Sequence, residues 1–290
     1  MSRVPYQPPP RVSLTPAPPS RGGEHRFSAK KSLGQHFLRD RGVLGRIVAA
    51  AALGPDDRVL EIGAGDATLT APLAASCGRL IALETDRRRL PALRARFPEG
   101  GHVEIVEADI LRFDLGTLAP LAPLKCVANL PYNIATAVLD RLLERRGMFS
   151  LLVLMFQKEV AKRLVAGPGD PAYGSLSLAT QYRAEASLLF TVPRTAFKPP
   201  PKVESAVVRL APRPEPLLPP DQERVFETLL RAGFTQRRKL FLNSAAASGL
   251  AIDRDALAAA LRAIGLTELA RAEEIPLEGF LRLAHVLAPG

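Results

Sequence analysis

A short apolar strand that runs into a glycine turn is the feature that most constrains the fold of this chain. Residues 58–62 are mostly apolar, and Gly63 and Gly65 follow them directly. Glycines at such a turn let the backbone approach a ligand, and a helix beyond the turn presents its positive N-terminus to that ligand. The apolar spacing over residues 67–75 predicts this helix. The pattern therefore predicts the strand–turn–helix unit of an α/β fold.

Polar residues end the next predicted strands. Three further strands are predicted, and their ends carry Glu84 after residues 79–83, Asp109 after 103–108 and Asn129 after 126–128. The carboxyl ends of parallel strands meet at one edge, where open α/β sheets bind ligands. Glu84 lies about 20 residues after the glycine turn, the spacing at which a carboxylate binds ribose hydroxyls. Asp109 suits the amino group of an adenine, so we expect a nucleoside ligand.

Two classes of nucleoside ligand fit a glycine turn with an acid after the next strand. A dinucleotide of an oxidoreductase is the generic interpretation, but Thr68 stands where the third glycine of that fingerprint is required. S-adenosylmethionine fits better, with its ribose on Glu84, its adenine on Asp109 and its methionine portion over Gly63 and Gly65. We therefore expect a Rossmann-like α/β methyltransferase core.

The sequence Asn-Leu-Pro-Tyr-Asn at residues 129–133 follows a strand and offers groups that can hold an aromatic amine. The side-chain oxygen of Asn129 and the backbone C=O of Leu130 can each accept a hydrogen bond from an –NH2 group. Pro131 restricts φ and so directs that carbonyl, and the ring face of Tyr132, rather than its hydroxyl, can stack on a base. Taken alone, the string is also compatible with an ordinary polar turn.

Five blocks in order and spacing resemble the ribosomal RNA adenine N6-dimethyltransferases that act on the small subunit. The resemblance covers residues 27–244. The blocks are Lys-Ser-Leu-Gly-Gln-His-Phe-Leu at 31–38, Glu-Ile-Gly-Ala-Gly at 61–65, Asn-Leu-Pro-Tyr-Asn at 129–133, Phe-Lys-Pro-Pro-Pro-Lys-Val-Glu-Ser at 197–205 and Phe-Thr-Gln-Arg-Arg-Lys at 234–239.

The resemblance implies a fold, an activity and a set of roles. It implies dimethylation of two adjacent adenosines near the 3′ end of 16S rRNA during ribosome biogenesis, with S-adenosylmethionine as donor. The donor site would comprise His36, Leu38, Gly63, Gly65, Glu84, Asp109 and Asn129. Catalytic contacts would come from Asn129, Leu130 and Tyr132, with Phe197 as the second aromatic wall of the base pocket. Two departures stand out: Ala67 replaces a usual glycine, and Ser175 replaces a frequent arginine.

The basic residues predict a polyanionic partner. The net charge is +10 and the isoelectric point is about 10.1, which favours nucleic acid, although a charge excess is also compatible with a plain solvated surface. The predicted RNA contacts are Lys30, Lys31, Arg194, Lys198, Lys202, Arg237, Arg238 and Lys239. Their clustering before the core, around residue 197 and in a late helix suits phosphate positioning.

Composition divides the chain into three parts. Residues 1–26 are proline-rich and are predicted to form a disordered tail. Residues 27–211 are predicted to form the catalytic domain, whose late strands around 190–192 and 203–210 should pair antiparallel. Prolines mark a linker, and residues 212–290 are predicted to form a small helical domain that contacts RNA.

Several classes are disfavoured. The two cysteines and four histidines lack metal-ligand spacing, so no metal is expected, and no apolar run of about 18 residues predicts a membrane span. We expect a cytoplasmic monomer whose partner is small-subunit rRNA or the immature small subunit. Three alternatives stay open: a large-subunit rRNA adenine methyltransferase of the macrolide-resistance type, a DNA N6-adenine methyltransferase, and a non-catalytic ribosome-assembly factor on the same fold.

Overall fold

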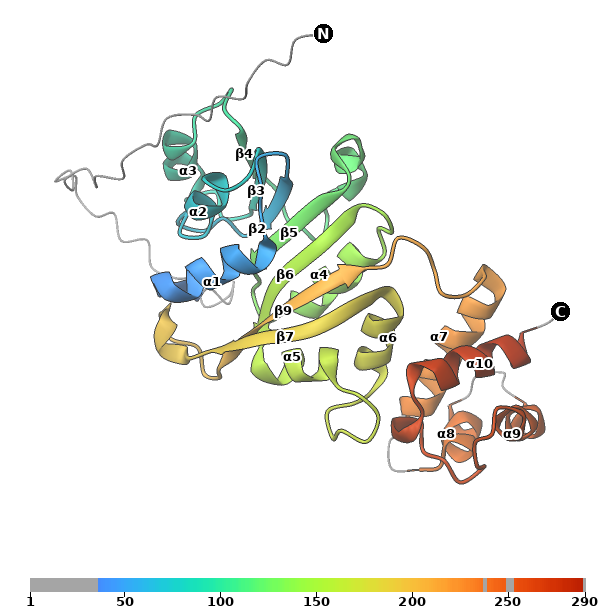
Figure 1. Cartoon of the computed structure of the whole chain (residues 1–290). Coiled ribbons are helices and arrows are strands. Elements are labelled where there is room, and N and C mark those ends of the chain that lie inside the picture. Colours follow the sequence, from blue (N-terminus) through green and yellow to red (C-terminus); the bar gives the residue numbers. More distant parts are fainter. Residues whose placement is uncertain (1–35, 237–238, 249–252, 289–290) are drawn as a thin grey trace, which may run out of the picture.

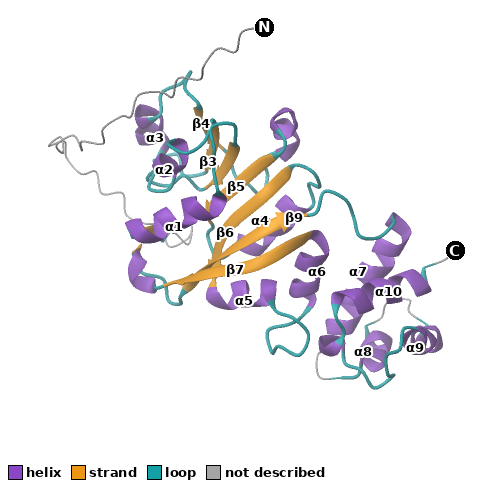
Figure 2. Cartoon of the chain, in the orientation of Figure 1, coloured by secondary structure: helices purple, strands orange, loops and turns teal. Residues whose placement is uncertain are grey.

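The apolar runs form one seven-stranded sheet within the part of the chain that the structure describes (Figure 2). The structure is a computed structural model, and it describes residues 36–236, 239–248 and 253–288. The strand order is β4-β3-β2-β5-β6-β9-β7. The strands are β2 (Arg58–Ile62), β3 (Arg79–Glu84), β4 (Val103–Glu107), β5 (Leu124–Asn129), β6 (Phe149–Gln157), β7 (Ala184–Val192) and β9 (Ser205–Pro212).

Strand direction decides which residues reach the functional edge. Strands β2 to β6 are parallel, whereas β9 runs antiparallel to both of its neighbours, β6 and β7. The predicted antiparallel pairing of the late strands is therefore confirmed. Because β9 is reversed, its first residue, Ser205, lies opposite Gln157, the last residue of β6. The start of β9 thus lies at the edge where the parallel strands end.

Helices cover both faces of the sheet, as expected for a Rossmann-like fold (Figure 1). One face packs against α1 (Arg41–Ala51), α2 (Thr70–Ala74) and α3 (Leu90–Arg96), and the other against α4 (Ala135–Leu143) and α5 (Lys158–Val165). Alternate residues of each strand point to opposite faces, so Val59 packs on the face that α1 and α2 cover and Leu60 on the face that α4 and α5 cover. Strands buried on both faces read as continuous apolar runs for this reason.

The helix after the glycine turn is shorter than predicted. It was expected over residues 67–75, but α2 begins only at Thr70. Ala67 adopts a left-handed conformation with φ of 63°, which is incompatible with a right-handed helical turn at that position. The three residues before Thr70 therefore extend the turn instead of the helix.

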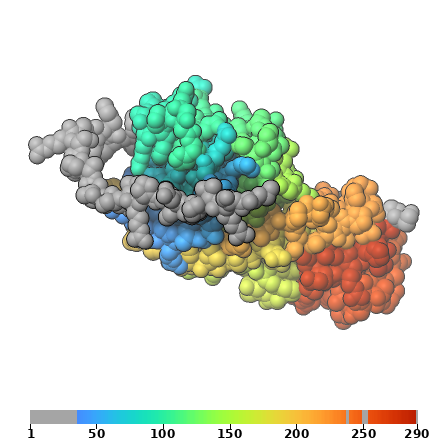
Figure 3. Space-filling view, turned by 45° about the horizontal axis from the view of Figure 1, so that its top comes forward, coloured from blue at the N-terminus to red at the C-terminus, as the bar shows by residue number. Residues whose placement is uncertain are grey.

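The C-terminal helices form the orange-to-red end of the surface in Figure 3 and build a second core. These helices are α7 (Pro220–Phe234), α8 (Phe241–Ala247), α9 (Arg254–Ala263) and α10 (Leu277–Leu287), and α6 (Ser175–Arg183) links them to the sheet. The second core also contains Tyr173 and Tyr182, which precede the predicted division at 211–212. Short 3-10 turns occur at Leu115–Leu121, Arg194–Ala196 and Ala272–Glu274.

One small element lies apart from the main sheet. Strand β1 (Phe37–Leu38) pairs antiparallel with β8 (Phe197–Lys198), and Leu38 lies opposite Phe197. The N–H groups of Arg39 and Asp40 donate to the C=O of Ala196. This pairing fixes the segment before α1 against the loop between β7 and β9, two parts of the chain that are far apart in sequence.

Candidate active site

A cavity of about 260 Å³ opens at the carboxyl edge of the sheet, over the ends of β2, β3, β4 and β5. The structure brings together all seven residues predicted to hold the donor, and each lines this cavity. They are His36, Leu38, Gly63, Gly65, Glu84, Asp109 and Asn129. Leu130 and Tyr132 also line it. The predicted donor residues and most of the predicted catalytic residues therefore share one space.

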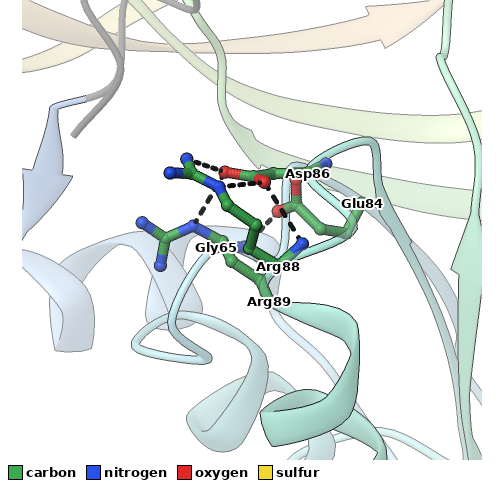
Figure 4. A network of polar contacts seen from close by, with 5 residues as sticks. All are labelled: Gly65, Glu84, Asp86, Arg88 and Arg89. Atoms are coloured by element: carbon green, nitrogen blue, oxygen red, sulfur yellow. Dashed lines mark hydrogen bonds and ion pairs between the residues drawn. The ribbon is translucent and has the colours of Figure 1, made fainter. Parts of the chain in front are cut away.

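The glycine turn is fixed by Glu84 (Figure 4). Gly63 and Gly65 have φ of 82° and 58°, a left-handed region in which glycine is favoured. The N–H of Gly65 donates to Oε2 of Glu84 at 2.7 Å, and the N–H of Asp86 donates to Oε1 at 2.7 Å. Glu84 is only 5% exposed. Each carboxylate oxygen accepts one backbone bond and retains a lone pair for a ligand hydroxyl.

Asp86 extends this network to Arg88 and Arg89 (Figure 4). Its carboxylate accepts hydrogen bonds from the side chain of Arg88 and lies 3.8 Å from Nε of Arg89. The guanidinium of Arg89 lies 4.3 Å from the centre of the Phe37 ring, a cation–π contact. A Cβ placed on Gly65 would lie 3.4 Å from that same ring. That distance is an ordinary van der Waals contact, so the positive φ of Gly65, and not a lack of space, favours glycine at this position.

Asp109 lies at the exposed rim of the cavity, just after β4. Its Oδ1 accepts a hydrogen bond from the N–H of Leu111 at 3.0 Å, which orients the carboxylate. The N–H groups of Arg112 and Phe113 donate to its backbone C=O. The ordinary turn role and a ligand role are therefore compatible in this residue.

Asn129 is held by its own amide. Its Nδ2 donates to the backbone C=O of His36 at 3.2 Å. Since the donor end is committed to the protein, Oδ1 is the end available to accept from a ligand. Asn129 ends β5, and the N–H of Ile134 donates to the C=O of Pro131 to close the turn that follows.

Tyr132 is fixed on two sides. Its ring stacks on the ring of His36 with centroids 5.8 Å apart and planes 26° apart. Its hydroxyl lies 2.6 Å from Oγ of Ser205. His36 is itself fixed, because its Nδ1 lies 2.9 Å from the C=O of Pro199. Burial raises the pKa of Tyr132, so its hydroxyl stays protonated at neutral pH.

Phe197 does not line the cavity in this structure. It lies on β8, is 4% exposed, and packs in the core beside Leu38. The ring that lies against Tyr132 is that of His36. Phe197 and His36 nevertheless belong to one unit, because β1 and β8 pair directly.

Glu61 is a cavity residue that was not predicted as part of the site. It is 1% exposed on β2, and neither carboxylate oxygen has a hydrogen-bond partner. Burial raises its pKa to about 8, which the nearby Glu84 also favours and the hydroxyl of Thr70 opposes. An acid inside an apolar strand was the available signal. Such a group favours a cationic ligand, because a positive charge would repay its desolvation.

The predicted RNA contacts are only partly within the described residues. Arg194, Lys198 and Lys202 are exposed around β8, and Nη1 of Arg194 donates to the C=O of Lys202. Lys239 is exposed before α8. Lys30, Lys31, Arg237 and Arg238 lie outside the described residues. Ser175, the residue found in place of an arginine, is exposed at the start of α6.

Other chemistry finds little support in the described ranges. Cys77 and Cys126 are free and buried, and burial raises the pKa of Cys77 to about 11, so its thiol is protonated at neutral pH. Among residues 36–236, 239–248 and 253–288, His, Cys, Asp and Glu form no group of three that could hold a metal. In the same ranges no helix is both long and apolar enough to span a bilayer.

Comparisons with known proteins agree with the site. The family of ribosomal RNA adenine dimethylases matches residues 26–288. Ribosomal RNA small subunit methyltransferase A of Pelotomaculum thermopropionicum is 46% identical over 270 residues, which cover 90% of this chain and 92% of that protein. The protein of the same name from Methylobacterium radiotolerans is 47% identical over 269 residues, covering 90% and 89%.

Solved structures give the same result. A dimethyladenosine transferase from Plasmodium falciparum superposes with a TM-score of 0.72 at 28% identity, covering 86% of this chain and 96% of that one. The 23S rRNA methyltransferase ErmE gives 0.70 at 31% identity, covering 87% and 99%. Fold and site thus define a nucleoside-binding α/β methyltransferase that uses S-adenosylmethionine. The chain belongs to the ribosomal RNA adenine dimethylase family.

Proposed function

We propose that this enzyme dimethylates the exocyclic amino groups of two adjacent adenosines near the 3′ end of small-subunit rRNA. The observation that carries the proposal is the fixed amide of Asn129 beside Tyr132 in a cavity suited to the donor. The curated relatives are named small-subunit methyltransferases, and the Plasmodium neighbour is named a dimethyladenosine transferase. The large-subunit and non-catalytic alternatives become outcomes of the test below.

The donor half of the site would use the ends of β2, β3 and β4. Glu84 would accept from the ribose hydroxyls, and Asp109 from the adenine amino group. Gly63 and Gly65 would lie under the methionine portion, and Glu61 would face its cationic end. Leu38 on β1 and His36 just before it would close this half. The buried, unpaired carboxyl of Glu61 is the feature that best fits a positively charged ligand.

The acceptor half would use residues that follow β5. Oδ1 of Asn129 and the C=O of Leu130 would each accept a hydrogen bond from the target amino group. Two acceptors favour the pyramidal amine, whose lone pair is less delocalised into the ring and is therefore more nucleophilic. The target base would stack on Tyr132, with His36, which immediately precedes β1, beside that ring. Phe197 on β8 would support this wall from behind through the pairing of β1 with β8.

The reaction needs orientation more than acid–base chemistry. When bound, S-adenosylmethionine would supply a methyl group activated by its bond to a sulfonium sulfur, and a neutral thioether would leave as the amino nitrogen bonds to the methyl carbon in line. The chain's own groups would align the nitrogen and exclude water. Methylation makes the amino protons acidic, so water suffices to accept one. Extruding the target base costs a few kcal/mol, and stacking offsets this by roughly 1–3 kcal/mol per aromatic ring.

Basic side chains would hold the RNA outside the cavity. Arg194, Lys198 and Lys202 surround the β8 side of the site, and Lys239 would extend the contact to the C-terminal helices. Lys30, Lys31, Arg237 and Arg238 would complete the set. Contacts of this kind fix register on the phosphate backbone without reading sequence.

The proposal extends to the division of the chain into domains and to where the enzyme acts. Residues 27–211 would form the catalytic domain and residues 212–290 the RNA-contacting domain. The proline-rich tail predicted for residues 1–26 lies outside the described residues. The enzyme would act as a cytoplasmic monomer on the immature small subunit. The net charge of +10 supports an RNA-rich partner of this kind.

Mapping methylated adenines tests the proposal directly. The purified chain and labelled S-adenosylmethionine are incubated separately with under-methylated small subunits and with large subunits, and modified adenines are located by primer extension. We expect dimethyladenosine at two adjacent positions near the 3′ end of the small-subunit rRNA. Label found only in the large subunit would favour the macrolide-resistance type. No label in either, with donor bound, would favour an assembly factor.

A further inference from the structure

Ser205 lies outside the cavity but contacts the ring that is proposed to stack on the target base. Its Oγ is 2.6 Å from the hydroxyl oxygen of Tyr132, across 73 residues of sequence. Ser205 is fully buried, at 0% exposed. The cavity lining includes Tyr132 but not Ser205. The side-chain contact of Ser205 with the cavity lining is therefore the one with Tyr132.

The backbone of Ser205 is held by two neighbouring strands. It pairs with Gln157 at the end of β6 and with Val192 at the end of β7. The backbone C=O of the preceding Glu204 accepts from the N–H of Lys158, and the side chains of these two residues form an ion pair at 2.7 Å. A hydroxyl on such a backbone is a fixed point, because strand pairing removes most of its freedom.

The turn that carries Tyr132 lies outside the sheet, and the Tyr132 ring is held through side-chain contacts. Tyr132 lies three residues after Asn129, the last residue of β5, and its side chain reaches across the end of β6 to meet β9. Its hydroxyl bond to Ser205 and its ring contact with His36 together set the plane of the ring. Only the reversed direction of β9 brings a buried serine to this edge.

We propose that Ser205 is a positioning residue that holds the Tyr132 ring in the orientation needed to receive the target adenine. The inference rests on the proposed stacking role of Tyr132. It also assigns a task to the Tyr132 hydroxyl, which the sequence did not suggest. Removing either hydroxyl leaves the other without its partner and releases the same ring, so the two removals should have one shared effect.

A double-mutant cycle with two measurements tests the inference. The variants are Ser205→Ala, Tyr132→Phe, both together, and Tyr132→Ala. Single-turnover methylation is measured on small subunits, and base capture is measured by the fluorescence of 2-aminopurine placed at a target position. Ser177→Ala is the matched control, because Ser177 is equally buried and lies outside the cavity lining. Its hydroxyl donates to the C=O of Arg163 on α5 and accepts from the N–H of Gly174, just before α6.

We expect Ser205→Ala and Tyr132→Phe each to slow methylation roughly threefold to tenfold, the range of one hydrogen bond. The double variant should be no slower than either single one, and all three should weaken the change in fluorescence. The three variants should bind the donor with wild-type affinity. Ser177→Ala should give the same change in fluorescence as the wild type.

Three results would overturn the inference. Wild-type methylation and fluorescence in Ser205→Ala would show that the ring needs no anchor, provided that Tyr132→Ala is impaired. Effects that multiply in the double variant would show that the two hydroxyls act independently. Should Tyr132→Ala itself methylate normally, the stacking role fails, and with it both this inference and the proposed acceptor half.

Discussion

The two halves of the site are built in different ways. Most of the proposed donor half comes from residues 61–109, where successive strands end side by side and Glu84 is bonded to the backbone of Gly65 and Asp86, and His36 and Leu38 close it. The acceptor half joins residues that are far apart in sequence: Asn129 is held by His36, and Tyr132 is held by His36 and Ser205. Local geometry fixes the first half, and tertiary contacts fix the second.

This difference has a functional consequence. Donor binding should depend on few residues and survive changes elsewhere, because its carboxylates are oriented by nearby backbone groups. Base capture should depend on distant contacts, because β1, β8 and β9 must all be in place around Tyr132. The predictions below test this separation, from the largest effect to the smallest.

Asn129→Ala should give the largest loss. It removes one oriented acceptor from the target amino group, which typically costs about 3–4 kcal/mol, a factor of about 100–1,000 in rate. The second methylation should suffer most, since a monomethylated amine has one proton left to orient. Single-turnover assays that separate mono- from dimethyladenosine check this. A wild-type rate for both steps would remove the amino-group clamp from the account.

Glu61→Gln should change how stability depends on pH. The pKa of Glu61 is raised from 4.5 to about 8 in the folded chain, so its favourable contribution is complete below about 4.5 and is lost as pH rises through about 8. Above about pH 4.5 the free energy of unfolding of the wild type falls, relative to that of Glu61→Gln, by about 1.4 kcal/mol per pH unit, and the loss reaches about 3 kcal/mol at pH 7. Urea unfolding from pH 5 to 9 should therefore show Glu61→Gln gaining on the wild type.

S-adenosylmethionine should reverse part of this difference, because its cationic end would favour the ionised carboxylate. If the free energy of unfolding varies with pH in the same way in the wild type and in Glu61→Gln, with and without donor, Glu61 is not the titrating group. Because Glu61 is buried beneath the proposed donor half, Glu61→Gln should leave base capture unaffected at both pH 5 and pH 9.

Replacing Lys198 and Lys202 by Gln should weaken RNA binding and reduce its salt dependence. Removing one phosphate contact lowers the log–log slope by roughly 0.7 for single strands or 0.9 for duplex. Filter binding at several salt concentrations measures the slope. The matched control is Lys162→Gln, since Lys162 is exposed on α5 and does not line the cavity. Equal slopes in all three proteins would make the two lysines part of a plain solvated surface.

Ala67→Gly should stabilise the chain slightly. Ala67 has φ of 63°, where a Cβ costs about 1–2 kcal/mol, while the buried methyl group recovers part of that. We expect a net gain of about 0.5–1 kcal/mol in urea unfolding. The neighbouring Ala64 is equally buried without a positive φ, so Ala64→Gly should destabilise the chain. A loss of stability in both variants would mean that the turn tolerates alanine without strain.

Sequence reasoning worked best where one segment determines its own structure. The apolar runs gave the strands, and the residues that follow them gave Glu84, Asp109 and Asn129 at one edge, because parallel strands align their ends. It was wrong about the first residues of α2, since nothing in the spacing revealed the left-handed φ of Ala67.

The acceptor half could not be predicted to the same depth. Strands β1 and β8 have two residues each, too few for any periodicity to appear. The partnership of Tyr132 with Ser205 depends on the reversed direction of β9 and spans 73 residues. Glu61 was visible as a charge within an apolar strand, but its lack of a partner is a tertiary property.

The most direct test of the separation measures both binding steps in two variants, Glu84→Ala and Tyr132→Ala. Calorimetry gives affinity for S-adenosylmethionine, and 2-aminopurine fluorescence in small subunits gives base capture. Glu84→Ala should lose about 1.5–3 kcal/mol of donor affinity and retain base capture, because only bonds to the ribose and the turn are removed. Tyr132→Ala should show the reverse. If either variant loses both steps equally, the site is one unit and the account of two separately built halves is wrong.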